Sequence, residues 1–160
     1  MATAAVGLAA SILTFTTVAA KLSTAAATLY RGYRSIKDAP SDLQRVETRL
    51  NDLEFILAQI NRTRSANPES VGDPATESYW ASKESKLRSD FIEFEHFTAQ
   101  LTANIGREFE HFTAQLTANI GRAKSRMKWL LSHEGRAKKV LGLLAEDIDM
   151  LRALHEIMQA

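Results

Sequence analysis

The spacing of apolar residues in the first 36 positions most constrains the fold of this 160-residue chain. The spacing alternates between three and four residues without a break. The apolar positions are Leu8, Ile12, Phe15, Ala19, Leu22, Ala26, Leu29, Tyr33 and Ile36. Such a stripe stays on one side of a helix and is typical of helices that pack against each other at a shallow angle. The pattern predicts one long helix that ends near Asp38, because Pro40 follows.

A second helix is predicted from Ser41, where Gln44 completes a capping-box pair. Its apolar stripe is Leu43, Val46, Leu50, Leu53, Leu57 and Ile60. The polar stretch at 65–77 contains Pro68, Gly72 and Pro74 and predicts a flexible loop. A third helix is predicted to start near 77–80. Its stripe is Leu87, Phe91, Phe94, Phe97, Leu101 and Ile105.

The last predicted helix runs from about His133 to Met158, with Ser132 as its cap. Its stripe is Leu141, Leu144, Ile148, Leu151, His155 and Met158. Four long helices with one loop predict an all-α, up-and-down bundle, with residues 1–160 as a single domain. We expect His155 to be a half-buried core histidine.

The fifteen residues EFEHFTAQLTANIGR occur at 93–107 and again, unchanged, at 108–122. The second copy continues the apolar stripe with Phe109, Phe112, Leu116 and Ile120, with a drift of about 60° per copy. A stop at Gly106 is the alternative, since glycine suits a helix C-cap. We favour a continuous helix. The repeat is interpreted as a recent in-frame duplication or an engineered insertion that the helical period absorbed.

No motif in the chain indicates an enzyme. It lacks a glycine-rich phosphate loop, a nucleophile elbow and an HExxH pair, and it has no cysteine for a disulfide or thiolate metal site. Each copy of the repeat contains Glu-x-x-His, at Glu93 with His96 and at Glu108 with His111. In di-iron bundles such pairs come from different helices, whereas here both are on one helix. We therefore expect a solvated polar face, and no catalytic residue, metal, cofactor or small-molecule substrate.

The first twenty residues carry no charge and approach the length of a membrane span. Their strongly apolar members are Val6, Leu8, Ile12, Leu13, Phe15 and Val18. Together these six favour insertion by about 2 to 4 kcal/mol. Thr3, Ser11, Thr14, Thr16 and Thr17 oppose it. The balance is near zero, which predicts a segment that inserts conditionally rather than constitutively.

Two basic segments are candidates for contact with an anionic surface, either lipid or nucleic acid. Residues 1–37 contain four basic residues and no acid: Lys21, Arg31, Arg34 and Lys37. Residues 122–139 contain seven against Glu134 alone: Arg122, Lys124, Arg126, Lys128, Arg136, Lys138 and Lys139. The second segment could equally be a solvated helix face, and Trp129 within it either an interfacial anchor or the closure of the bundle end. We do not expect nucleic acid, because base-reading polar companions are missing.

Two stretches carry a family resemblance: YRGYRSIKDAPSDLQRVETRLNDLEFILAQI at 30–60 and RMKWLLSHEGRAKKVLGLLAEDIDMLRALHEIM at 126–158. The most specific points are the KDAP turn at 37–40 and the KW pair at 128–129. With the alanine- and threonine-rich first helix, the chain resembles the HeLo-like domain, the N-terminal domain of fungal STAND (NLR-like) proteins. The resemblance covers the chain except for the second copy of the repeat.

The resemblance implies a non-enzymatic module of fungal programmed cell death, heterokaryon incompatibility and innate immunity. Such domains are helical bundles that oligomerise and send the N-terminal helix into the plasma membrane. Here residues 1–20 would be the membrane-active segment. Lys21, Arg31, Arg34 and Lys37 would meet the headgroups and add roughly 4 kcal/mol.

The implied partners are a second copy of the chain, an anionic membrane and a nucleotide-binding receptor chain. The implied location is the cytoplasm, with movement to the plasma membrane on activation. A soluble helical adaptor that associates without membrane activity is the alternative. It remains open whether the chain is a fragment of a receptor, a stand-alone partner or an inactive copy.

Overall fold

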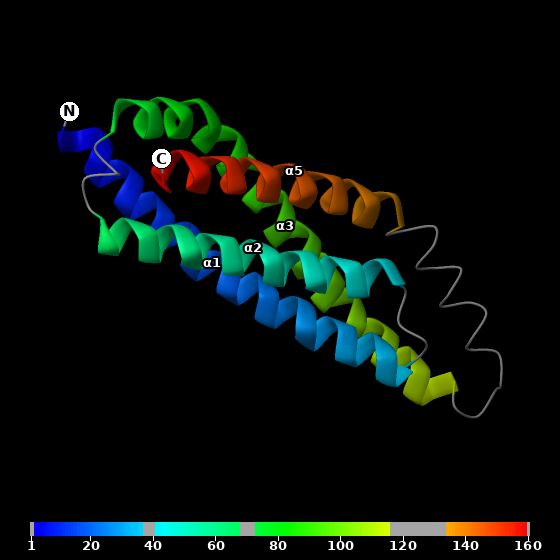
Figure 1. The fold of residues 1–160 in the computed structure, drawn as a ribbon. Coiled ribbons are helices and arrows are strands. Elements are labelled where there is room, and N and C mark those ends of the chain that lie inside the picture. Colours follow the sequence, from blue (N-terminus) through cyan, green and yellow to red (C-terminus); the bar gives the residue numbers. More distant parts are fainter. Residues whose placement is uncertain (1, 37–40, 68–72, 116–133, 160) are drawn as a thin grey trace.

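The structure is a computed structural model that describes residues 2–36, 41–67, 73–115 and 134–159. These ranges form four helices (Figure 1): α1 (Ala2–Ile36), α2 (Ser41–Ala66), α3 (Pro74–Gln115) and α5 (Glu134–Gln159). The described ranges contain no strand, so the predicted all-α bundle is confirmed.

Contacts between the helices show which of them pack side by side. Within the described ranges α1 packs on α2 and α3, and α5 packs on α2 and α3. Ser23 contacts Asn51, and α2 runs antiparallel to α1 beside it (Figure 1). Ser11 contacts Glu84 and Phe15 contacts Phe91, so α1 and α3 run in parallel.

The chain alternates in direction, as predicted, but consecutive helices are not always side by side. α2 and α3 lie diagonally across the bundle, as do α1 and α5 (Figure 1). Short connections between antiparallel neighbours would have placed α3 beside α2. The observed order gives α3 one flank against α1 and another against α5, so α3 joins the two.

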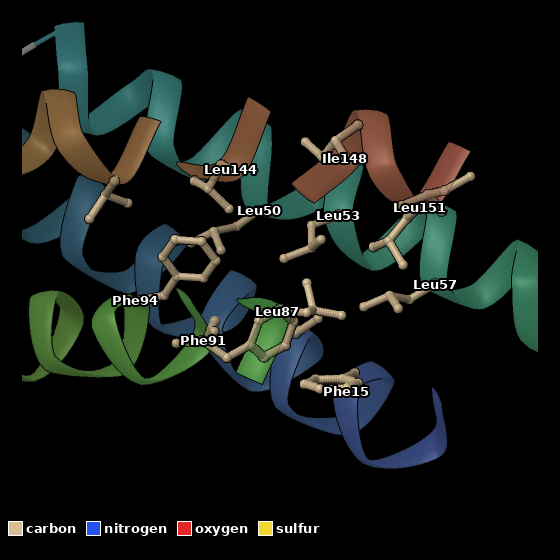
Figure 2. Close-up of a cluster of buried hydrophobic side chains, with 14 of the residues drawn as sticks. Phe15, Leu50, Leu53, Leu57, Leu87, Phe91, Phe94, Leu144, Ile148 and Leu151 are labelled. Atoms are coloured by element: carbon tan, nitrogen blue, oxygen red, sulfur yellow. The ribbon is translucent and has the colours of Figure 1, made fainter. Parts of the chain in front are cut away.

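The core lies along the predicted stripes of all four helices. Figure 2 shows Phe15, Leu53, Leu87 and Ile148, one from each helix, directed toward one another. The stripe positions of α1 from Leu8 to Leu29, all those of α2, and those of α3 from Leu87 to Leu101 are buried. Full burial of one such side chain stabilises a fold by about 1.5–3 kcal/mol. Tyr33, Ile36 and Ile105 have side chains outside the described set.

The stripe of α5 lies slightly differently from the prediction. Leu144, Ile148, Leu151 and Met158 are buried and His155 is half-buried, as expected, but Leu141 is only half-buried. Further buried positions on α5 are Ala137, Val140, Asp147 and Leu154. The buried face is therefore centred closer to the series 140, 144, 147, 151, 154 and 158, which includes an aspartate.

The predicted loop at 65–77 is too long, and the predicted start of the third helix is about one turn late. α2 continues to Ala66, and α3 already begins at Pro74. Proline suits the first position of a helix because its missing N–H would have no partner there. Asp73 precedes it, and its carbonyl accepts the Glu77 N–H at 3.0 Å. The predicted loop includes Pro74, whereas in the structure this proline is the first residue of α3.

α3 continues through the junction of the two repeat copies to Gln115. Continuity is therefore confirmed, and a stop at Gly106 is wrong. At 42 residues the helix is about 63 Å long. Positions 116–133 lie outside the described residues. They include Leu116, Ile120, Trp129, Ser132 and the basic residues Arg122, Lys124, Arg126 and Lys128. The side chains of Glu108, Phe109, His111 and Phe112 are also outside them.

Candidate membrane-active helix

The structure divides the six apolar residues predicted to be membrane-active. Leu8, Ile12 and Phe15 are buried in the core, and Val18 is partly buried against it. Leu13 lies on the outer side of α1 with 48% of its surface exposed. The side chain of Val6 lies outside the described set. In this state, therefore, three of the six side chains are already enclosed by protein.

Phe15 is the main aromatic contact between α1 and α3. Its ring lies edge-on to Phe91, with centroids 4.9 Å apart and a 73° angle between the planes. It also lies edge-on to Trp80 at 5.8 Å and 75°. Edge-to-face pairs contribute about 0.5–1.5 kcal/mol beyond area burial. Phe15 therefore anchors the first half of α1 on α3.

Polar contacts between α1 and the other helices are few. The Ser11 hydroxyl donates to Glu84 Oε1 at 3.0 Å, and Ser23 Oγ contacts Asn51 Oδ1. Among the residues that the structure describes, no ion pair joins α1 to another helix. Apolar packing is consequently the main force that holds α1 in the bundle.

Five threonine hydroxyls of α1, at 14, 16, 17, 24 and 28, are bonded within the helix itself. Thr14, Thr16 and Thr17 donate to the carbonyls of Ala10, Ile12 and Leu13, at 3.0, 2.6 and 2.9 Å. Thr24 and Thr28 make the same bond one turn back. A hydroxyl that keeps its partner costs much less to bury than an unpaired one. These threonines therefore oppose membrane entry less than their number in the sequence implies.

One helix in the described part of the chain is long and apolar enough to cross a membrane, over Ala10–Gly32. This stretch of 23 residues overlaps the predicted segment 1–20 but begins later and includes Lys21 and Arg31. Part of it is buried within the bundle, and buried helices of soluble proteins meet the same criterion.

The structure describes the side chains of two of the four basic residues predicted to face lipid. Lys21 and Arg31 are exposed, and Arg31 Nε donates to the Ala27 carbonyl at 3.3 Å. The side chains of Arg34 and Lys37 lie outside the described set. Lys21 and Arg31 thus lie on the outer side of α1, away from the core.

Part of the second basic segment belongs to a cluster between α3 and α5. Arg136 Nε donates to Glu93 Oε1 at 3.4 Å, and Arg136 also donates to Gln100. Lys139 Nζ lies 4.0 Å from the same Glu93 oxygen. Arg136 of α5 therefore bonds side chains of α3 within the bundle. A fully solvated helix face or a lipid-facing patch would not predict these contacts. Lys138 is exposed.

The Glu-x-x-His motif of the first copy does not assemble a metal site. Glu93 bonds Arg136, whereas His96 is exposed. Among the described residues, no group of three His, Asp or Glu side chains is placed to hold a metal ion. His155 is half-buried, as predicted, and its Nε2 lies 2.8 Å from Thr63 Oγ1 of α2.

A charge cluster between α3 and α5, with two buried aspartates, is absent from the sequence-based predictions. Lys86 Nζ lies 2.7 Å from Asp90 Oδ2, 3.0 Å from Glu146 Oε2 and 3.2 Å from Asp147 Oδ1. Burial lowers the pKa of Lys86, but the hydrogen bonds to these carboxylates outweigh that effect and raise it above its usual range. The signal was available, because positions 90 and 147 continue the heptad spacings 87–90–94 and 144–147–151.

Comparison with family models, curated proteins and solved structures finds no match to this chain.

Proposed function

We propose that this chain is a non-enzymatic effector module that keeps α1 packed in a helical bundle and releases it into an anionic membrane on activation. The observation that carries the proposal is how α1 is held. Its contacts are apolar along the core, and the hydroxyls of Thr14, Thr16 and Thr17 are bonded within the helix. No ion pair between described residues joins it to another helix.

Apolar contacts are the kind that a bilayer can replace. The hydrophobic effect is not directional, so a side chain that leaves a protein core for hydrocarbon keeps most of its stabilisation. The large buried side chains of α1 are Leu8, Ile12, Phe15, Leu22 and Leu29. Their burial contributes roughly 8–15 kcal/mol to docking, and hydrocarbon would return much of it. An interhelical ion pair would have no such replacement.

The rest of the bundle keeps its own connections when α1 leaves. Lys86 and Arg136 join α3 to α5 through carboxylates, and the Thr63–His155 contact joins α2 to α5. Departure of α1 would uncover apolar side chains of α2 and α3 that it now covers, such as Trp80 and Phe91. A newly exposed apolar surface favours association with a second copy. Release of α1 and oligomerisation would thus be linked.

The membrane partner is proposed from charge. Lys21 and Arg31 are exposed and lie within or beside the apolar stretch. Each basic residue near an anionic leaflet contributes about 1 kcal/mol. The resemblance to HeLo-like domains supports the same assignment, with a cytoplasmic resting state, movement to the plasma membrane and a role in regulated cell death.

A soluble adaptor is the second candidate, and the burial of α1 favours it. Leu8, Ile12, Ala19 and Ala26 are at most 1% exposed, so α1 is a full member of the core. In this reading α1 never leaves, and the module acts by association of intact bundles.

Dye release from anionic vesicles tests the proposal. Leu13→Asp changes a residue that is 48% exposed in the bundle, so the fold should tolerate it. In a membrane the same charge costs about 2.5–3.5 kcal/mol, so we expect release to fall sharply. Phe55→Asp on α2 is the matched control, since Phe55 is 58% exposed and should release dye like the parent. Undiminished release by Leu13→Asp would exclude α1 as the inserting element, and no release by a folded parent would favour the adaptor.

A further inference from the structure

Asp147 of α5 is a carboxylate enclosed in the core between α3 and α5. Its side chain is 1% exposed, and Leu144, Ile148 and Leu151 on the same helix are buried beside it. Oδ1 accepts a hydrogen bond from Lys86 Nζ at 3.2 Å. Oδ2 is buried and has no hydrogen-bond partner among the described residues. An ionised carboxylate with one oxygen unpaired is an expensive group to enclose.

Lys86, which donates to Asp147, also pairs with two other carboxylates. Asp90, whose side chain is 10% exposed, and Glu146 both lie within 3.0 Å of Lys86 Nζ. If all three carboxylates were ionised, one ammonium would face three negative charges. Two of those acids, Asp90 and Asp147, are largely removed from water. In such a low-dielectric environment like charges repel each other more strongly than they do in water.

The other charged groups named on α2 and α5 have contacts of their own. α2 packs on another flank of α5, where Arg45, Arg49 and Asp52 line a groove with Leu141 and Ala145. Farther along, His155 of α5 contacts Thr63 of α2. Asp149 and Arg152 of α5 are exposed and pair with each other at 3.8 Å. α1 does not pack on α5 within the described ranges.

We propose that Asp147 is a buried proton-binding site, with the Asp90 carboxylate as the acceptor beside it, and that proton binding there strengthens the docking of α5 on α3. A proton on Asp147 removes one of the three negative charges. It also makes the carboxyl group a donor, and a neighbouring carboxylate is a strong acceptor. One proton on Asp147 would therefore give its unpaired oxygen a hydrogen-bond partner and reduce the negative charge around Lys86.

The electrostatics of the site agree with the geometry. Burial and then the adjacent Asp90 raise the pKa of Asp147 from 3.8 to about 8, although Lys86 opposes the shift. The folded chain therefore binds a proton that the unfolded chain releases. Stability from this group is greatest at low pH, falls as pH rises from the ordinary carboxyl range, and is lost above about pH 8.

The first test is a carbon-13 NMR titration of the side-chain carboxyl carbons in the full chain. We expect one aspartate carbon to titrate near pH 8 and to disappear in Asp147→Asn, which imitates the protonated form. The proposal is wrong if every aspartate of the folded parent titrates in the ordinary acidic range. This result does not depend on whether the variant folds.

The second test is the urea midpoint of unfolding between about pH 5.5 and 8.5. The parent midpoint should fall across this range, the Asp147→Asn slope should be clearly shallower, and Asp149→Asn should keep the parent slope. Lys86→Gln should move the titration of Asp147 to higher pH, because the ammonium favours the ionised form. A parent slope retained in Asp147→Asn, or an unmoved titration in Lys86→Gln, would overturn the assignment. A merely structural lysine would not shift the titration.

Discussion

Phe15 of α1 lies edge-on against Phe91 of α3, with ring centroids 4.9 Å apart. This contact joins the helix proposed to leave the bundle to the helix that also holds α5. Because α3 contacts both α1 and α5, the strength with which α1 is held depends on side chains of α3.

Phe15→Ala should weaken that hold more than any exposed substitution. Loss of a buried phenylalanine costs about 3–5 kcal/mol through lost burial and the cavity left behind. Under the proposed function the same change should increase dye release, since α1 is loosened while its outer face is unchanged. Urea unfolding and vesicle release measure the two effects. Phe55→Ala is the control and should stay within about 0.5 kcal/mol of the parent, because Phe55 is 58% exposed.

Arg136→Ala should have a small effect on stability. The Arg136–Glu93 pair is partly exposed, at 28% and 26% of the side chains, and partly exposed ion pairs contribute up to about 1 kcal/mol. A double-mutant cycle with Glu93→Ala, followed by urea unfolding, should give a coupling of that size. A coupling of several kcal/mol would show that this cluster is a main link between α3 and α5.

Removal of residues 108–122 should leave the core intact. The buried core side chains among the described residues lie at 8–101 and 137–158, and the contacts to Arg136 come from Glu93 and Gln100 of the first copy. The deletion shortens the chain by about 22 Å of helix if all fifteen residues are helical. We expect the free energy of unfolding to stay within about 1 kcal/mol of the parent. A loss of several kcal/mol would mean that the second copy has become part of the fold.

Much of this fold follows from local patterns. The first helix ends before Pro40 and the second begins at Ser41, as proline geometry and capping predict. The heptad stripes identify most of the core, although Trp80, Val140 and Leu154 lie outside them. These features are local in sequence, and the periodicity of a helix converts them directly into a buried face.

Other features depend on which helices meet. The position of α3 beside α1 rather than α2 is set by the fit of side chains such as Phe15 against Trp80 and Phe91, which no single helix reveals. Asp147 lies outside the predicted stripe of the last helix, because that stripe follows apolar residues. Its burial becomes reasonable only when Lys86 of another helix is seen within 3.2 Å. The burial of Leu8 and Ile12 also shows that a charge-free segment can be a core helix at rest.

The measurement that most directly tests the release of α1 is dye release by a chain in which α1 is reversibly fixed to α3. The chain has no cysteine, and the Ser11 hydroxyl lies 3.0 Å from Glu84 Oε1. A Ser11→Cys, Glu84→Cys variant can therefore be joined by a short bis-thiosulfonate cross-linker that reducing agent removes. Ser11→Cys alone, treated identically, is the control. The account predicts no release while the link is intact and release after reduction. Equal release from the linked and reduced protein would contradict it.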